Sequence, residues 1–167
     1  MDANKLKSLN ELAPILHAFK RRGRKIVLCH GCFDLVHYGH LKHFEAAKSQ
    51  GDLLVVTVTP DCYIAKGPDR PFFTLEQRCE YLSALSMIDY VAANDSPSSA
   101  DAIRLLSPDV YIKGVEYKFM PNDEKLKQEI DAVESVGGHI HYTEEIVYSS
   151  TKLIDEGLRR KNEELIT

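Results

Sequence analysis

The chain has 167 residues, of which 44% are hydrophobic and 28% charged, and its net charge is −4 at pH 7. That length fits one domain with an apolar core, so we expect residues 1–167 to form a single domain. A chain without a basic surplus favours neither nucleic acid nor an acidic membrane surface as a partner. Its apolar run at 53–58 is much shorter than the ~20 residues of a membrane span. Because the N-terminus is polar and predicts no secretory signal, we expect a cytoplasmic protein with reduced cysteines.

Helical and strand-like segments alternate along the chain. We expect helices at 8–22, 39–50, 74–87, 99–106, 123–136 and 150–161, and strands at 25–29, 53–59, 90–93, 110–113 and 139–142. This alternation predicts an α/β fold, a Rossmann-like three-layer sandwich with a mostly parallel sheet. Ligands bind beyond the carboxyl ends of such strands, which should bring the loops 30–40, 59–72 and 113–122 together. The segment 150–167 is also a candidate linker to a further domain.

The first strand runs directly into Gly31-Cys32-Phe33-Asp34-Leu35-Val36-His37-Tyr38-Gly39-His40, and a helix follows. Backbone N–H groups at a helix N-terminus attract anions, and Gly39 would let a phosphate approach the backbone closely. The imidazoles of His37 and His40 could donate hydrogen bonds to an oxyanion as charge builds. Alternatively, His37 caps the turn and His40 is a surface residue. The combination of strand, glycine turn, paired histidines and helix favours phosphoryl or nucleotidyl chemistry.

This segment resembles the H-x-G-H signature of the cytidylyltransferase-like nucleotidyltransferase superfamily. Within it, the chain most resembles the adenylyltransferase domain of bifunctional heptose-7-phosphate kinase/heptose-1-phosphate adenylyltransferases. Glycerol-3-phosphate cytidylyltransferases are more distant. The resemblance spans about residues 27–153 and includes three further blocks, at 66–71, 76–78 and 148–153.

The resemblance assigns roles to individual residues. His37, His40 and Lys66 would be catalytic, stabilising charge at the reacting phosphate. Glu116 and Tyr117 would bind the substrate, although Val115-Glu116 departs from the family's usual Gly-Asp. No residue is assigned as a metal ligand. The expected nucleotide-binding residues are Gly31, Cys32, Phe33, Asp34, Gly39, Arg78, Lys113, Gly114, Ser150 and Thr151.

The implied reaction transfers AMP from ATP to a sugar phosphate resembling heptose-1-phosphate, giving an ADP-sugar and pyrophosphate, with Mg²⁺ arriving on the triphosphate. One alternative is a CTP-dependent cytidylyltransferase acting on glycerol-3-phosphate or a related small phosphate. Another is a non-catalytic nucleotide-binding or dimerisation module. We also expect a homodimer, and a sugar kinase domain following residue 167 would fit the chemistry.

Two smaller patterns leave other classes of site open, although packing without a function is the favoured interpretation of each. Cys29 and Cys32 form a C-x-x-C pair, which leaves a redox protein as a third interpretation. His139 and His141 share one face of a strand, but a metal site there would need a third ligand.

Overall fold

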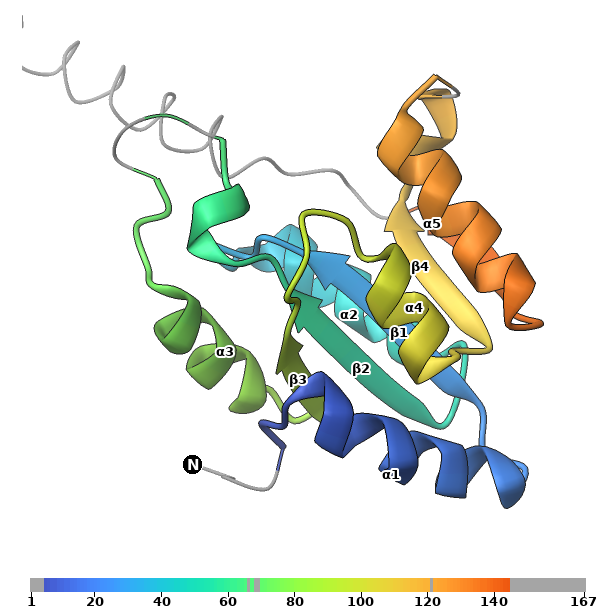
Figure 1. The fold of residues 1–167 in the computed structure, drawn as a ribbon. Helices are drawn as coiled ribbons and strands as arrows, with labels where there is room; N and C mark the ends of the chain where they lie inside the picture. The colour runs from blue at the N-terminus through green and yellow to red at the C-terminus, as the bar shows by residue number, and fades with distance from the viewer. Residues whose placement is uncertain (1–4, 66, 68–69, 121, 145–167) are drawn as a thin grey trace, which may run out of the picture.

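The computed structural model describes residues 5–65, 67, 70–120 and 122–144. They form one five-stranded sheet in the order β3-β2-β1-β4-β5 (Figure 1), and every pair of neighbouring strands is parallel. This confirms the predicted Rossmann-like α/β fold. The strands are β1 (Ile26–Gly31), β2 (Leu53–Val58), β3 (Tyr90–Ala93), β4 (Val110–Gly114) and β5 (His139–Thr143).

Helices cover both faces of the sheet. Three lie on the face turned to the viewer in Figure 1, namely α1 (Leu9–Arg21), α4 (Ala100–Leu106) and α5 (Glu124–Ser135). The other face is covered by α2 (Tyr38–Lys48) and α3 (Leu75–Ser83). Two short 3₁₀ turns, η1 (Asp61–Tyr63) and η2 (Val115–Phe119), lie in segments that the sequence predicted as loops.

The strands carry apolar side chains on both faces, as buried parallel strands do. Along β1, Ile26 and Leu28 pack with α1, α4 and α5, whereas Val27 and Cys29 pack with α2 and α3. All six residues of β2 are buried, as its continuous apolar run predicted. These two cores fix the sheet between its helices and leave its carboxyl edge to the loops.

The strand order creates a topological switch point at that edge. From β1 the chain proceeds to β2 and β3 on one side, and β4 then pairs with the other side of β1. Loops that leave β1 and β4 therefore diverge at the switch point, where ligands bind in doubly wound folds. The H-x-G-H segment follows β1, and the segment containing Glu116 and Tyr117 follows β4.

Capping boxes begin two of the helices. Ser8 and Glu11 form the capping box of α1, and Pro14 is accommodated inside that helix. Thr74 and Gln77 likewise cap α3. However, α3 ends at Ser83, four residues before the predicted end.

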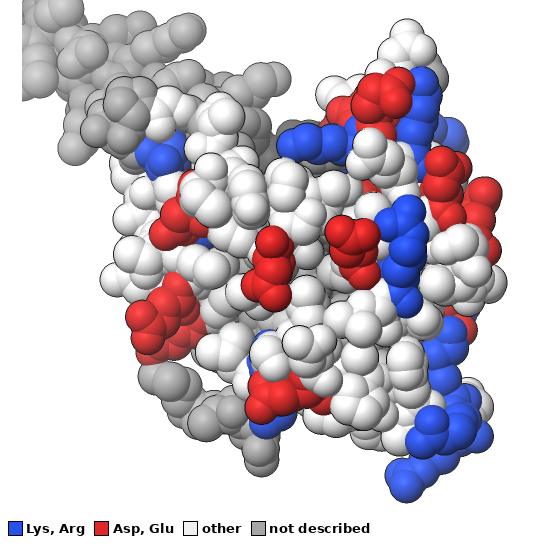
Figure 2. All heavy atoms as spheres, in the orientation of Figure 1, with Lys and Arg blue, Asp and Glu red and all other residues white. Residues whose placement is uncertain are grey.

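The surface has no dominant charge on the side that Figure 2 displays. Acidic and basic side chains are interspersed, and basic ones gather near the C-terminal end of α1, where Lys20 and Arg21 lie in the last turn. No helix in the described part of the chain is both long and apolar enough to cross a membrane.

Candidate active site

The H-x-G-H turn brings its two imidazoles together at the start of α2. His37 is the N-cap residue, and its ring stacks on that of His40 with 4.0 Å between centroids. The backbone N–H of His37 donates to Nδ1 of His40 at 3.4 Å, which places the N–H of a neutral His40 ring on Nε2. Burial lowers the pKa of His37, so this imidazole is neutral at neutral pH.

Glycine is required at the start of this turn. Phe33 has a positive φ of 49°, and a Cβ atom at Gly31 would lie 2.8 Å from its ring. The Phe33 ring in turn packs edge-on against His40, with 5.5 Å between centroids. Gly31 and Phe33 therefore shape the turn that holds the histidines.

Asp34 lies in the same turn, and its carboxylate binds the loop that precedes α3. Its carboxylate accepts the Nε–H of Arg70 at 2.6 Å and the backbone N–H of Phe73 at 3.0 Å. Burial acts to raise the pKa of Asp34, but backbone N–H groups of Phe73 and Phe72 and the Arg70 guanidinium outweigh it and hold the pKa below its usual value. Asp34 is therefore an ionised anchor for the 59–74 loop.

Arg78, on α3, is completely buried and donates to several acceptors of the protein itself. Its Nη1 donates to the carbonyl of Cys32 at 2.5 Å, and its Nε to that of Phe73 at 3.1 Å. Its Nη2 donates to the carbonyl of Thr59 at 2.8 Å and to Asp61 at 2.6 Å. Arg78 thus ties the loops that follow β1 and β2 to the start of α3.

Buried polar side chains of β4 and α5 form a network with Ser99. The ammonium of Lys113 is 2.7 Å from Oε2 of Glu129, with 8% and 5% of the two side chains exposed. Ser99 donates to the other carboxylate oxygen at 2.7 Å and also hydrogen-bonds Tyr111 at 2.9 Å. The positive charge of Lys113 is therefore neutralised by Glu129 of α5. The Lys113 ammonium also lies 4.6 Å from the ring centroid of Tyr117.

Glu116, in η2, has a buried carboxylate oxygen, Oε2, to which no group in the described ranges of the chain donates a hydrogen bond. A Cβ atom at Gly114 would collide with this carboxylate. Glycine at 114 therefore leaves room for the Glu116 carboxylate after the end of β4.

Known proteins resemble this chain over most of its length. A family model described as cytidylyltransferase-like matches residues 28–156. The chain belongs to the cytidylyltransferase-like family. It is 40% identical over 163 residues to the bifunctional protein HldE of Geobacter metallireducens, and the match covers 96% of this chain and 32% of that protein. The HldE protein of Syntrophotalea carbinolica is 36% identical, with the same coverage. The chain therefore spans about a third of the length of these relatives.

Solved structures share the fold of this cytidylyltransferase-like chain. A lipopolysaccharide core biosynthesis protein from Thermoplasma volcanium superposes with a TM-score of 0.60 at 21% identity, covering 76% of this chain and all of that one. Pantoate-beta-alanine ligase from Francisella tularensis gives a TM-score of 0.58 at 13% identity, covering 83% of this chain and 66% of that one. At these identities the likeness supports the fold alone.

The expected site of this family member is described only in part. The segment from the last residue of β1 to the first turn of α2 holds Gly31, Phe33, Asp34, His37 and His40. Cys32 contributes its carbonyl to Arg78, and Gly39 is buried in the first turn of α2. Three expected site residues, Lys66, Ser150 and Thr151, lie outside the described residues.

The cysteine and histidine patterns gain no support from the structure. Cys29 is buried within β1, and burial raises the pKa of its thiol, which disfavours the thiolate that redox chemistry needs. All four cysteines are free thiols. Within the described ranges, no group of three or more His, Cys, Asp or Glu side chains is placed to hold a metal ion.

Sequence reasoning missed the partners that hold this site. Asp61 and Thr59 received no role and Arg70 only a weak one, because their contacts join residues far apart in the chain. Glu129, in contrast, could have been predicted from the sequence as a buried, paired carboxylate. It lies three residues from both Leu126 and Ala132, on the buried face of α5, where a carboxylate needs a charged partner.

Proposed function

We propose that this chain is a nucleotidyltransferase that transfers AMP from ATP to a sugar phosphate and releases pyrophosphate. The observation that carries the proposal is the stacked His37–His40 pair at the N-terminus of α2, at the switch point of a cytidylyltransferase-like domain. Backbone N–H groups, the helix dipole and ring N–H groups there suit an anion that gains charge.

The proposed reaction is an in-line displacement at the α-phosphorus. A phosphate oxygen of the sugar phosphate forms a new bond to the α-phosphorus as the bond to the bridging oxygen of pyrophosphate breaks. That phosphate is ionised near neutral pH, so the reaction needs no general base. His37 and His40 stabilise the charge that develops on the α-phosphate, and Lys66 adds a positive charge from its loop.

Binding of the remaining substrate groups falls to the other loops. Ser150 and Thr151 hold the β- and γ-phosphates, and the Arg78 connections keep the H-x-G-H turn and the 59–74 loop in register. Oε2 of Glu116 accepts a hydrogen bond from a hydroxyl group of ribose or of the sugar. Mg²⁺ enters on the triphosphate and is held mainly by phosphate oxygens.

The adenylyl preference and the sugar-phosphate acceptor rest on similarity to the HldE proteins. Because those relatives are about three times as long and are called bifunctional, we propose that a sugar kinase acts together with this domain. The kinase would supply the phosphorylated sugar. A cytoplasmic location and a homodimer complete the proposal.

The test is pyrophosphate release by the His40→Ala variant with MgATP and a panel of sugar 1-phosphates. We expect the turnover number to fall by about two orders of magnitude or more, because one donor to the developing charge is lost. The matched control is His139→Ala, whose imidazole is exposed at the start of β5, far from the carboxyl edge. If His40→Ala turns over at the rate of the control, His40 has no catalytic role.

A further inference from the structure

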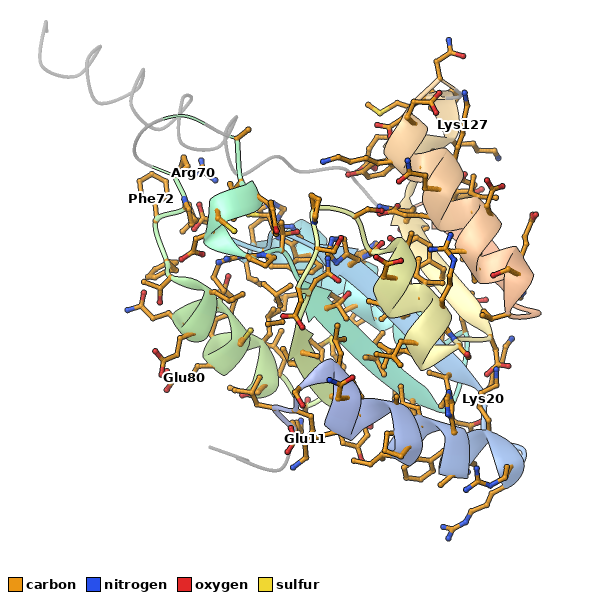
Figure 3. All side chains as sticks on the ribbon, viewed as in Figure 1. Glu11, Lys20, Arg70, Phe72, Glu80 and Lys127 are labelled. Atoms are coloured by element: carbon orange, nitrogen blue, oxygen red, sulfur yellow. The ribbon has the colours of Figure 1, made fainter. Side chains whose placement is uncertain are left out.

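Arg70 carries a buried guanidinium whose hydrogen bonds are incomplete. Only 9% of its side chain is exposed, and its Nε–H donates to Asp34 at 2.6 Å. The guanidinium carbon lies 4.8 Å from the ring centroid of Phe72, and Figure 3 shows the two side chains together on the loop before α3. Among the residues that the structure describes, no group accepts a hydrogen bond from its buried Nη2.

Such a donor is costly, because a buried N–H without an acceptor loses its hydration and gains nothing in return. The neighbouring Arg78 contrasts with it, since all three of its guanidinium nitrogens donate to oxygen atoms of the protein. Each guanidinium nitrogen of Arg78 thus has an acceptor in the protein, whereas Nη2 of Arg70 has none among the described residues. A ligand that brings its own acceptor would account for this difference.

The position of Arg70 indicates the chemistry of that ligand. Asp34 holds it from the turn that also carries His37, so the guanidinium is tied to the segment that forms the proposed phosphate site. Guanidinium groups bind phosphate oxygens through parallel N–H donors, and pairing at Nε leaves the Nη groups for such contacts. Phe72 packs against the flat guanidinium and restricts its orientation.

We propose that Arg70 is a phosphate-binding residue that donates from Nη2 to a phosphate oxygen of a substrate while Asp34 holds its Nε. This inference rests on the proposed function. The phosphate belongs either to the nucleoside triphosphate or to the acceptor. Asp34 is then a positioning residue that acts through Arg70.

The test compares wild type with Arg70→Lys, which keeps the positive charge beside Asp34 but removes the fork. Dissociation constants are measured by calorimetry for inorganic pyrophosphate, MgATP and glucose 1-phosphate. We expect about a ten- to hundredfold loss of affinity, the range for a hydrogen bond to a charged group. A loss for pyrophosphate and MgATP assigns Arg70 to the nucleotide, and a loss for glucose 1-phosphate alone assigns it to the acceptor.

The matched control is Arg104→Lys, because Arg104 is exposed on α4 and pairs with Asp101. A purely structural Arg70 would lower the melting temperature of the unliganded protein and leave all three dissociation constants within twofold of wild type, which would overturn the inference. If Arg70→Lys does not fold, Arg70→Gln is measured in the same way with the same criterion. Failure of wild type to bind any probe would instead contradict the proposed function itself.

Discussion

Two histidines outside the H-x-G-H pair are held neutral by the fold. Burial, reinforced by the nearby Lys113 ammonium, lowers the pKa of both His30 and His43 to about 4. His30 lies 3.0 Å from the hydroxyl of Thr57, and His43 lies 2.9 Å from that of Thr143. Both imidazoles therefore act as neutral hydrogen-bonding groups below the carboxyl edge of the sheet.

These histidines predict how stability changes with pH. Below the ordinary pKa of 6.5 the unfolded chain binds protons that the folded chain takes up only near pH 4. The free energy of unfolding should therefore fall as the pH drops from about 6.5 to about 4, by ~2 kcal/mol for each histidine. Urea unfolding of wild type and His43→Gln across this range measures the effect. The variant should show a shallower fall than the His139→Gln control, and equal slopes would contradict the assignment.

At the same scale, the sequence predicted a phosphate-handling H-x-G-H turn but not the contacts that hold it. The signature is local, so the strand, the glycine turn and the family resemblance were enough to predict roles for His37 and His40. The Asp34–Arg70 pair joins residues 36 positions apart, and Arg78 reaches Cys32 across 46 positions. No periodicity in the sequence encodes such contacts, which arise only when the loops meet at the sheet edge.

Among the elements, α3 has the largest deviation from the predicted bounds. The predicted helix extended to residue 87, but the helix ends at Ser83. Asp89 explains the difference, because its backbone N–H donates to the carbonyl of Leu54 and its carboxylate accepts the N–H of Leu54. These bonds draw the chain onto β2, so the helix ends before residue 87.

The hydrogen bonds of Arg78 lead us to expect that the stability of the protein depends on the link between α3 and the loops beside it. Arg78→Lys should lower the free energy of unfolding by about 2–4 kcal/mol without nucleotide, because one ammonium cannot satisfy the carbonyls of Cys32, Thr59 and Phe73 together. Urea unfolding measures this, with the exposed Arg104→Lys expected within about 0.5 kcal/mol of wild type. Unchanged stability with a loss of nucleotide affinity would instead assign Arg78 directly to the triphosphate.

For the whole molecule, alternation of strands and helices was enough to predict the fold class and the site edge. The strand order was not predicted, because it depends on which strands pair across the sheet. That order places the loops after β1 and β4 on either side of the switch point. The family match over residues 28–156 and the fold agree with a nucleotidyltransferase domain, and the chemistry of transfer is the central claim.

The most direct test of that claim follows the α-phosphorus. Wild-type protein is incubated with Mg²⁺, ATP labelled at the α-phosphorus and a panel of sugar 1-phosphates, with α-labelled CTP in parallel. The account predicts that label from ATP appears in a sugar nucleotide in step with pyrophosphate release, only when an acceptor is present, and faster than with CTP. Nucleotide binding without labelled product or pyrophosphate for any acceptor would contradict it and favour a non-catalytic nucleotide-binding module.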